Sequence, residues 1–294
     1  VVKKYDIRYF FYNGGNDSMD TCNKISKFMQ KSGYKCRVMG VPKTIDNDLY
    51  KTDHCPGYAS AAKYVATSTM EVYHDAMVYD TPMVCVLEVM GRNAGWLTAA
   101  TALATYKGAG PQLIYLPEKE FDMDKFIADC KKVYENNHGK LIVAVSEGIK
   151  DKGGKYISEY GSDLAQTKDS FGHAQLGGTA QVLANVLKNE LKCKTRAIEF
   201  SLLQRCAAHW ASKTDVDETF TAGQKAVQFA VDGTTDHMVA YERSEKDGKY
   251  FCNYILVNLA EVANTEKDVP SDWFNADGTG LNQNYINYAL PLIE

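Results

Sequence analysis

Apolar segments of strand length alternate with longer segments of helical periodicity along most of this 294-residue chain. In the segment 18–31, for example, apolar side chains recur at intervals of three and four residues, as Met19, Cys22 and Ile25 do. Such alternation is typical of β-α-β units, whose strands form parallel sheets covered by helices on both faces. We therefore expect an α/β fold with mainly parallel, Rossmann-like sheets.

The predicted strands span residues 7–12, 36–41, 84–90, 112–116, 141–146 and 195–202. The predicted helices span residues 18–31, 59–76, 95–106, 122–134, 177–188 and 215–231. The polar, glycine-containing segment 148–172 predicts a loop or a lid. Near the C-terminus, segments 238–241 and 250–259 flank Asp247-Gly248, a dipeptide that favours a hairpin turn, so we expect a short antiparallel addition there.

The composition excludes several classes of protein. A net charge of −4 and the lack of any long basic run argue against a nucleic-acid partner. No apolar stretch approaches the ~18 residues of a membrane span, so no membrane partner is expected either. The eight cysteines are scattered and form no C-x-x-C pair, which favours reduced thiols in a cytoplasmic protein.

The stretch from Pro42 to Asp48 places one lysine and two aspartates directly after the predicted strand 36–41. Ligands bind at the carboxyl ends of strands in parallel α/β sheets. There, one aspartate can accept a hydroxyl proton, a second can hold Mg²⁺, and Lys43 can neutralise phosphate charge. This stretch therefore predicts a site for phosphoryl transfer.

Four other predicted strands also end in glycine or charged residues. Five such clusters at one sheet edge predict a binding cleft rather than ordinary turns. The residues in the other four clusters are Gly14, Gly15, Asn16, Asp17 and Ser18; Met90, Gly91 and Arg92; Glu147; and Arg205. The glycines would let backbone amides approach a phosphate at a helix N-terminus.

Simpler explanations remain open for the clusters near the N-terminus. Gly14-Gly15 also fits a plain strand-to-helix turn, and Asp17 or Ser18 could simply cap the helix that follows. Asp46 and Asp48 could likewise be capping residues, although the neighbouring lysine favours a site.

The later clusters have similar alternatives. Arg92 could be a surface residue, Glu147 could cap the lid, and Arg205 could belong to a salt bridge. The histidines show no metal-ligand spacing. His209 differs from the rest because a helix would place it on the same face as Arg205.

The order of these motifs resembles the phosphofructokinase family, and most closely its pyrophosphate-dependent members, the diphosphate–fructose-6-phosphate 1-phosphotransferases of the clostridial type. The resemblance rests on Gly14-Gly15-Asn16-Asp17-Ser18, Pro42 to Asp48, Met90-Gly91-Arg92, Ser146-Glu147-Gly148 and the tail residues 262–265. It implies a phosphofructokinase-like fold. It also implies Mg²⁺-dependent, reversible transfer of a phosphoryl group from diphosphate to the 1-hydroxyl of fructose 6-phosphate, a step of glycolysis.

The resemblance also implies residue roles. Asp46 would deprotonate the sugar hydroxyl, with Lys43 and Asp17 as its catalytic partners. The sugar phosphate would be bound by Thr44, Ile45, Asp46, Met90, Gly91, Arg92, Glu147, Arg205 and His209. The donor phosphates would be bound by Gly14, Gly15, Ser18 and Lys43. Mg²⁺ would be held by Asn16, Asp17 and Asp48.

Two positions indicate the phosphoryl donor. Relatives that use ATP usually carry glycine where this chain has Asp17 and Lys43. A carboxylate at residue 17 would crowd and repel the α-phosphate of a nucleotide, whereas the lysine supplies charge for diphosphate. An ATP-dependent phosphofructokinase is the alternative enzyme, and a non-catalytic sugar-phosphate-binding paralogue is the alternative from another class.

The chain also departs from its relatives. Asn16 stands where many of them carry a Mg²⁺-binding aspartate, and a glycine-rich segment that precedes the matching residues in the family has no counterpart before Val1. We therefore expect this chain to be part of a longer polypeptide. We expect three regions: 1–135 for donor binding and catalysis, 136–237 for the sugar phosphate, and 238–294 as a hairpin and tail. Family members assemble as homodimers or homotetramers, and the same is expected here.

Overall fold

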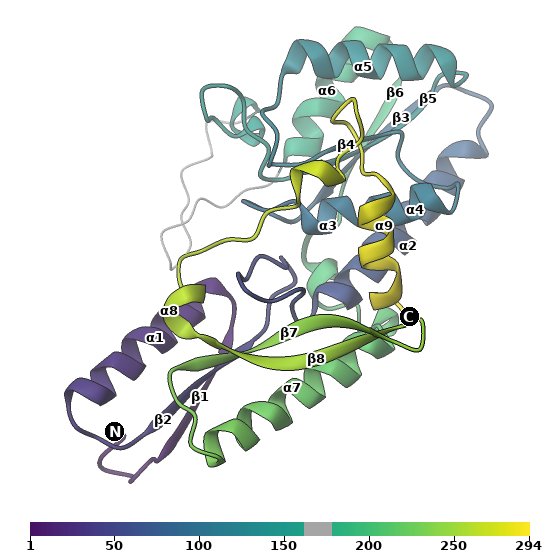
Figure 1. The fold of residues 1–294 in the computed structure, drawn as a ribbon. Coiled ribbons are helices and arrows are strands. Elements are labelled where there is room, and N and C mark those ends of the chain that lie inside the picture. The colour runs from purple at the N-terminus through teal and green to yellow at the C-terminus, as the bar shows by residue number, and fades with distance from the viewer. Residues whose placement is uncertain (162–177) are drawn as a thin grey trace. The chain divides into compact units, whose positions relative to one another are not determined.

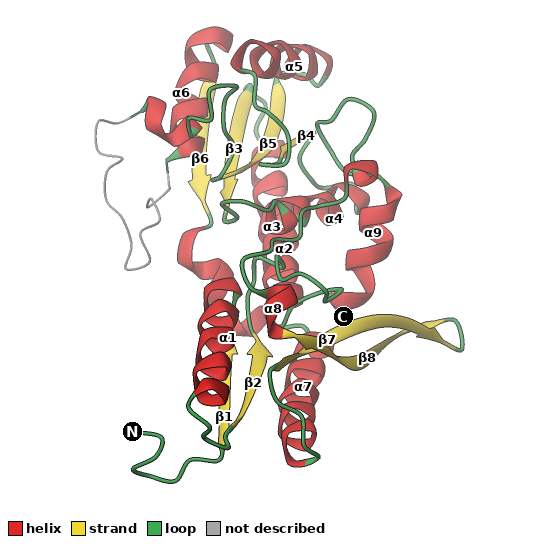
Figure 2. Cartoon of the chain, turned by 60° about the vertical axis from the view of Figure 1, so that its left-hand side comes forward, coloured by secondary structure: helices red, strands yellow, loops and turns green. Residues whose placement is uncertain are grey.

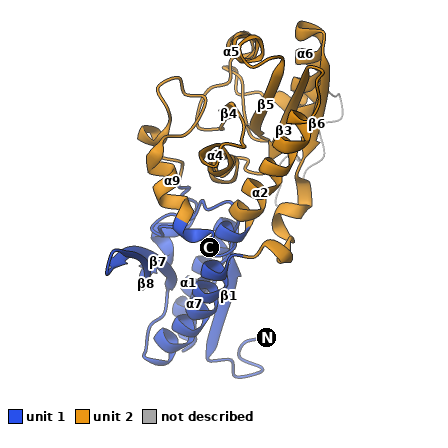
Figure 3. Cartoon of the chain, turned by 90° about the vertical axis from the view of Figure 1, so that its right-hand side faces the viewer, with its two compact units in different colours: residues 1–60, 212–267, 291–294 blue, residues 61–211, 268–290 orange. Residues whose placement is uncertain are grey.

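The computed structural model describes residues 1–161 and 178–294 (Figure 1). These residues form two compact units, each built around one four-stranded sheet (Figure 3). Unit 1 contains residues 1–60, 212–267 and 291–294, and unit 2 contains residues 61–211 and 268–290. Among the described helices, none combines the length and the apolar composition needed to cross a membrane.

Unit 1 has a mixed sheet with the strand order β1-β2-β7-β8. Its strands are β1 (Tyr9–Gly14), β2 (Arg37–Pro42), β7 (His237–Lys246) and β8 (Lys249–Asn258). The pairs β1–β2 and β2–β7 are parallel, and β7–β8 is antiparallel. Its helices are α1 (Asn16–Lys31), α7 (Lys213–Val231) and α8 (Leu259–Val262).

Helices cover both faces of this sheet. Because alternate residues of a strand point to opposite sides, neighbouring residues of β2 pack against different helices. Val38 of β2 packs with residues of α1, whereas its neighbour Met39 packs with Ala222 and Ala226 of α7. Figure 2 shows α1 and α7 on opposite sides of the strands. At the β7–β8 turn, Asp247 and Gly248 have φ values of 54° and 72°, the left-handed pair that a two-residue hairpin requires.

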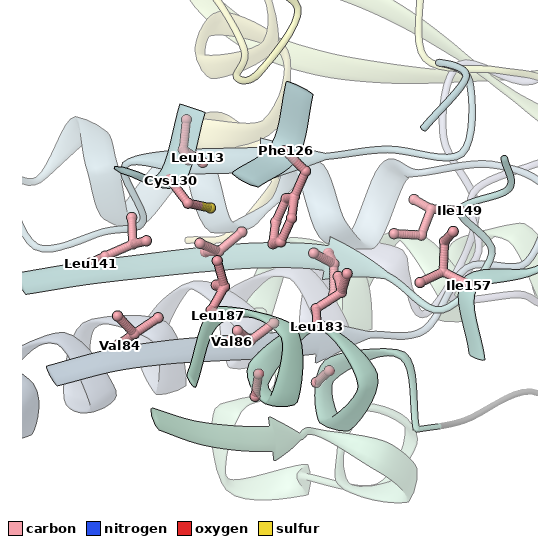
Figure 4. Close-up of a cluster of buried hydrophobic side chains, with 14 of the residues drawn as sticks. Val84, Val86, Leu113, Phe126, Cys130, Leu141, Ile149, Ile157, Leu183 and Leu187 are labelled. Atoms are coloured by element: carbon pink, nitrogen blue, oxygen red, sulfur yellow. The ribbon is translucent and has the colours of Figure 1, made fainter. Parts of the chain in front are cut away.

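Unit 2 has a wholly parallel sheet with the order β4-β5-β3-β6. Its strands are β3 (Met83–Val89), β4 (Leu113–Tyr115), β5 (Lys140–Ser146) and β6 (Lys194–Glu199). Every residue of β3 and β5 is buried, as expected for central strands covered on both faces. Helices α5 (Met123–Asn136) and α6 (Thr179–Leu191) pack onto this sheet through the apolar cluster in Figure 4.

The remaining α-helices of the described residues are one long helix, α2, and three short ones. They are α2 (Tyr58–Met77), α3 (Trp96–Ala99), α4 (Thr101–Tyr106) and α9 (Gln283–Ala289). The 3-10 helices span Ile157–Tyr160, Ser201–Arg205, Ala208–Trp210, Ser271–Trp273 and Leu290–Leu292.

The fold class predicted from the sequence is confirmed, including the antiparallel addition, and a few elements differ. The predicted helix 95–106 is two helices, because Leu103 bonds to Ala100 with 3-10 spacing. The predicted strand 195–202 ends at Glu199 and continues as a 3-10 helix. Of the predicted lid 148–172, residues 162–172 lie outside the described residues. The two units have other boundaries than the regions 1–135, 136–237 and 238–294, whose division by role stays a prediction.

Candidate functional site

In unit 1, the loops after β1 and β2 begin side by side. The two strands are parallel and in register up to the pair Gly14 and Pro42. Beyond that pair, the Lys43 amide donates to the Gly14 carbonyl at 2.9 Å. The glycine pair and the charged stretch that the sequence singled out therefore share one sheet edge.

The first of these loops closes tightly onto helix α1. A Cβ atom at Gly14 would lie 2.1 Å from Ser18 Oγ, so a side chain there would displace the serine. Gly15 is the N-cap of α1, and no side chain caps this end. Asp17 and Ser18 lie inside the first turn, so neither is the capping residue that the alternative explanation required. The first-turn amides of a 16-residue helix remain available to an anion.

Asn16 ties this helix to the segment after α8. Its Nδ2 donates to the Thr265 carbonyl at 3.2 Å, and its Oδ1 accepts from the Asn264 amide at 2.9 Å. The side chain that stands in place of an aspartate thus already has a structural task. Among the three residues expected to hold Mg²⁺, this favours the carboxylates Asp17 and Asp48 over the amide.

The second loop is folded around Thr44 and Asn47. Thr44 Oγ1 accepts from the Asp46 amide at 3.1 Å, which fixes the backbone at the expected catalytic base. Asn47 is fully buried and has a left-handed φ of 57°. Its Oδ1 accepts from the Cys55 amide at 2.9 Å. Asn47 thus joins the start of the loop to residues 52–56, the return limb of the loop.

Asp48 is the candidate metal ligand that fits best. Burial, reinforced by the charge of Asp46, raises the pKa of Asp48 to about 7. Its Oδ1 is buried and has no hydrogen-bond partner among the described residues. A buried carboxylate oxygen with no donor beside a second carboxylate suits a divalent cation, for which oxygen ligands are preferred.

Lys43 is exposed and lines an open hollow of about 430 Å³. The hollow is also lined by Pro56, Gly57, Asp215, Val216, Thr219 and Phe220. The ammonium group of Lys43 is thus accessible to a ligand on this side of the loop. Ile45 and Asp46 in the same loop are half-buried.

In unit 2, the loops after β3 and β5 also lie together. The strands are in register up to Val89 and Ser146. The Gly91 amide donates to Glu147 Oε1 at 3.2 Å, and Ser146 Oγ donates to the Gly91 carbonyl. Gly91 has a φ of 134°, a conformation that favours glycine.

Gly148, in the loop after β5, allows a close approach of these two loops. A Cβ atom at Gly148 would lie 1.9 Å from the Arg92 carbonyl oxygen. The contact brings Arg92 and Glu147, both half-buried, to the same edge of the sheet. An arginine beside a carboxylate can bind a phosphate and a hydroxyl of one sugar phosphate.

The loop after β6 joins the same edge through Gln204. This buried side chain accepts from the Met90 amide at 3.0 Å and donates to the Ser201 carbonyl at 3.0 Å. Arg205 follows it and is exposed. His209 is also exposed but belongs to a separate 3-10 helix, so the shared helical face predicted for it and Arg205 does not form.

Three residues that organise these loops were assigned no role from the sequence: Asn47, Ser146 and Gln204. Asn47 carried a signal, because a side chain that supports a left-handed backbone often stands between turn residues. The contacts of the other two left no local signal, since their partners lie 55 and 114 residues away in the chain.

Known proteins resemble this chain over its whole length. The family profile described as phosphofructokinase matches residues 1–200. The pyrophosphate–fructose 6-phosphate 1-phosphotransferases of Halomonas elongata and Methylococcus capsulatus are each 43% identical to this chain, across 100% of it and 69% of each relative. The crystal structure of the pyrophosphate-dependent phosphofructokinase from Nitrosospira multiformis matches with a TM-score of 0.87 and 40% identity, across 100% of this chain and 69% of that one.

Proposed function

This chain belongs to the phosphofructokinase family, and we propose that it catalyses reversible phosphoryl transfer from diphosphate to the 1-hydroxyl of fructose 6-phosphate. The products are fructose 1,6-bisphosphate and phosphate. The observation that carries this proposal is the pair of adjoining loops in unit 1: the N-terminus of α1, with no side-chain cap, follows β1, and one lysine and two aspartates follow β2. Phosphoryl transfer needs such groups to bind phosphate, to accept a proton and to hold a metal ion.

In the proposed mechanism, Asp46 accepts the proton of the sugar 1-hydroxyl as its oxygen attacks the transferred phosphorus. The bond from that phosphorus to the bridging oxygen breaks, and phosphate leaves. Lys43 neutralises the charge of the transferring group, and the first-turn amides of α1 bind the donor beside Gly14 and Gly15. Positioning and charge neutralisation thus supply the catalysis.

Most of the residues assigned to the sugar phosphate lie in unit 2. Arg92 and Arg205 would bind its phosphate, Glu147 would accept its hydroxyls, and Met90 and Gly91 would contact it through the backbone. Thr44 and Ile45 are assigned to the same substrate, with His209 as a further contact.

Mg²⁺ is assigned to Asp17 and Asp48, with Asn16 as a weaker ligand. When bound, the ion supplies positive charge that offsets the phosphate oxygens during transfer. A cytoplasmic location, a homodimeric or homotetrameric assembly and membership of the clostridial type stay predictions.

The test is formation of fructose 1,6-bisphosphate from fructose 6-phosphate and Mg²⁺, with diphosphate and ATP as separate donors. It is run on this protein, with Asp46→Ala as the inactive control. Turnover with diphosphate and not with ATP is expected. Turnover with ATP alone would overturn the donor assignment, and sugar-phosphate binding without turnover would favour a non-catalytic paralogue.

A further inference from the structure

A buried polar cluster in unit 1 lies behind the loop that carries Asp46. His54 is 2% exposed, and its Nε2 lies 2.6 Å from Glu218 Oε2 of helix α7. The other oxygen of Glu218 accepts from the Tyr250 hydroxyl of β8 at 2.6 Å. The His54 ring also packs against the Tyr241 ring of β7, with the centroids 4.7 Å apart. Three elements of the unit therefore hold one loop histidine.

The hydrogen-bonding pattern shows which ring nitrogen of His54 makes the contact. Nε2 faces Glu218 Oε2, a carboxylate oxygen that can only accept, so Nε2 is the donor. Nδ1 is buried and has no partner among the described residues. The histidine is therefore held through Nε2.

His54 lies on the return limb of the catalytic loop. The neighbouring Thr52 donates through Oγ1 to the His54 carbonyl at 2.8 Å and accepts from the Tyr241 amide at 2.9 Å. The Asp53 amide donates to the Tyr241 carbonyl at 2.9 Å. The residues just before His54 are thus fixed to strand β7 at two successive positions.

The return limb also contacts the segment that carries Asp46 and Asp48. Cys55, directly after His54, donates its amide to Asn47 Oδ1, and Asn47 stands between Asp46 and Asp48. The Pro56 carbonyl accepts from the Thr44 amide at 3.1 Å, which closes the loop from the other side. The path from Glu218 to Asp46 therefore runs through one histidine and one asparagine.

We propose that His54 and Glu218 are positioning residues, which hold the return limb so that Asn47 keeps Asp46 and Asp48 in their working geometry. This inference rests on the proposed function, because it gives the loop its catalytic task. Neither residue is assigned a contact with a substrate. They act by limiting the movement of the loop, together with its buried residues Leu49 and Cys55.

A metal site is the other explanation for this cluster, because ligand atoms of His54, Glu218 and Cys252 all lie within 4.8 Å of one another. The distances favour hydrogen bonding instead. His54 Nε2 and Glu218 Oε2 already lie 2.6 Å apart, which is hydrogen-bond distance. A metal-bound histidine also usually donates its second ring N–H, and Nδ1 has no acceptor within residues 1–161 and 178–294.

The test compares variants that keep or remove the contact between His54 and Glu218. Glu218→Gln keeps an acceptor for His54 and a polar contact with Tyr250, whereas Glu218→Ala removes both. His54→Gln places an amide nitrogen near the position of Nε2, whereas His54→Asn places it near Nδ1, away from Glu218. Ala226→Gly is the matched control, since it loosens α7 at a buried alanine outside the cluster.

The first readout is steady-state kinetics at a temperature where all variants are folded. Glu218→Ala and His54→Asn are expected to lose about 10- to 100-fold in kcat with little change in KM for fructose 6-phosphate. Glu218→Gln and His54→Gln should recover most of that loss, and Ala226→Gly should turn over like the wild type. Equal losses in Ala226→Gly and Glu218→Ala would reduce the cluster to a general stabilising role and overturn the proposal.

The second readout is amide hydrogen exchange in peptides that cover residues 44–50, which needs no activity. Glu218→Ala and His54→Asn should speed exchange there, and the two glutamine variants should not. If the wild type turned over no donor, the proposed function would fail while this readout still decided the positioning claim. Unchanged exchange in both disruptive variants, or slower exchange on adding Zn²⁺ to the wild type, would reject positioning by a hydrogen-bonded cluster.

Discussion

At the scale of single residues, Asp17 and Lys43 are expected to select the phosphoryl donor. Both side chains are exposed in unit 1, Asp17 in the first turn of α1 and Lys43 in the loop after β2. Replacing both with glycine should remove the repulsion of a nucleotide and the charge that anchors diphosphate. The Asp17→Gly/Lys43→Gly variant should gain measurable turnover with ATP and lose about 100-fold or more in kcat/KM with diphosphate, a loss typical of a removed transition-state contact.

Donor-competition assays on the single and double variants would measure this change. Lys24→Gly, at an exposed position of α1 with a surface ion pair to Asp20, is the control and should leave the donor preference unchanged. A double variant that keeps its preference for diphosphate would show that donor choice lies elsewhere in the protein.

Glu88 is expected to make the stability of the protein depend on pH. It is buried in β3, where its Oε2 accepts from the Ala180 amide at the start of α6. Burial is the main cause that raises its pKa to about 7 from an ordinary value of 4.5. Its folded pKa exceeds its unfolded pKa, so its contribution to stability is complete below about pH 4.5 and is lost as the pH rises through 7.

Glu88→Gln should therefore be more stable than the wild type at pH 8, by up to about 3 kcal/mol, and the difference should shrink towards pH 5. Urea unfolding at several pH values measures it. The exposed Glu190→Gln, which loses only a surface pair with Lys131, is the control and should follow the wild-type profile between pH 5 and 8. Parallel profiles for wild type and Glu88→Gln would contradict the expectation.

The residue scale also shows what the sequence could and could not predict about the candidate site. Residues that directly follow a strand were found from the pattern, because strand ends in a parallel sheet share an edge: Lys43, Gly91 and Glu147 are examples. Gln204 was missed because its amide meets Met90 only after the sheet has formed. Side chains that act on distant backbone groups leave no local signal.

At the scale of elements, Lys140 is expected to hold the end of helix α2. This buried lysine at the start of β5 donates to the carbonyls of Ala76, Tyr79 and Thr81 at 3.0, 2.5 and 2.8 Å. Lys140→Met keeps the length of the side chain but leaves these carbonyls without a donor. The free energy of unfolding should fall by about 2–4 kcal/mol.

Thermal and urea unfolding of the protein would measure this loss. Lys131→Met is the matched control, because Lys131 pairs with Glu190 at the surface and both side chains are 42% exposed. It should change stability by less than about 1 kcal/mol. Equal effects of the two methionine variants would mean that the carbonyls find other partners when Lys140 is lost.

Elements were predictable to different degrees, for physical reasons. The hairpin followed from Asp247-Gly248 alone, since few residues adopt two left-handed conformations in succession. The break between α3 and α4 did not, because the alanine-rich sequence 97–104 favours a continuous helix. The sheet orders β1-β2-β7-β8 and β4-β5-β3-β6 pair strands far apart in sequence, and hydrophobic periodicity does not encode such pairings.

At the scale of the whole molecule, the assigned tasks divide between the two units. Unit 1 carries Asp46, Lys43 and the α1 terminus, and unit 2 carries the arginines and Glu147, although Thr44 and Ile45 of unit 1 are also assigned to the sugar. Substitution of Asp46 or of Arg92 should therefore remove one task and spare the other. Asp46→Ala should lower kcat by several orders of magnitude, because transfer loses its base, while fructose 6-phosphate binds almost as in the wild type.

Arg92→Met should do the reverse, because it removes a charge assigned to the sugar phosphate and none assigned to the donor. We expect the Kd for fructose 6-phosphate to rise by about 10- to 100-fold, the value of one charge-assisted contact, while diphosphate still protects the variant against thermal unfolding. Calorimetry with each ligand separately would measure both effects. If Asp46→Ala raised the Kd for fructose 6-phosphate as much as Arg92→Met does, the base and the sugar-phosphate contact would not be separate tasks, and this assignment would fail.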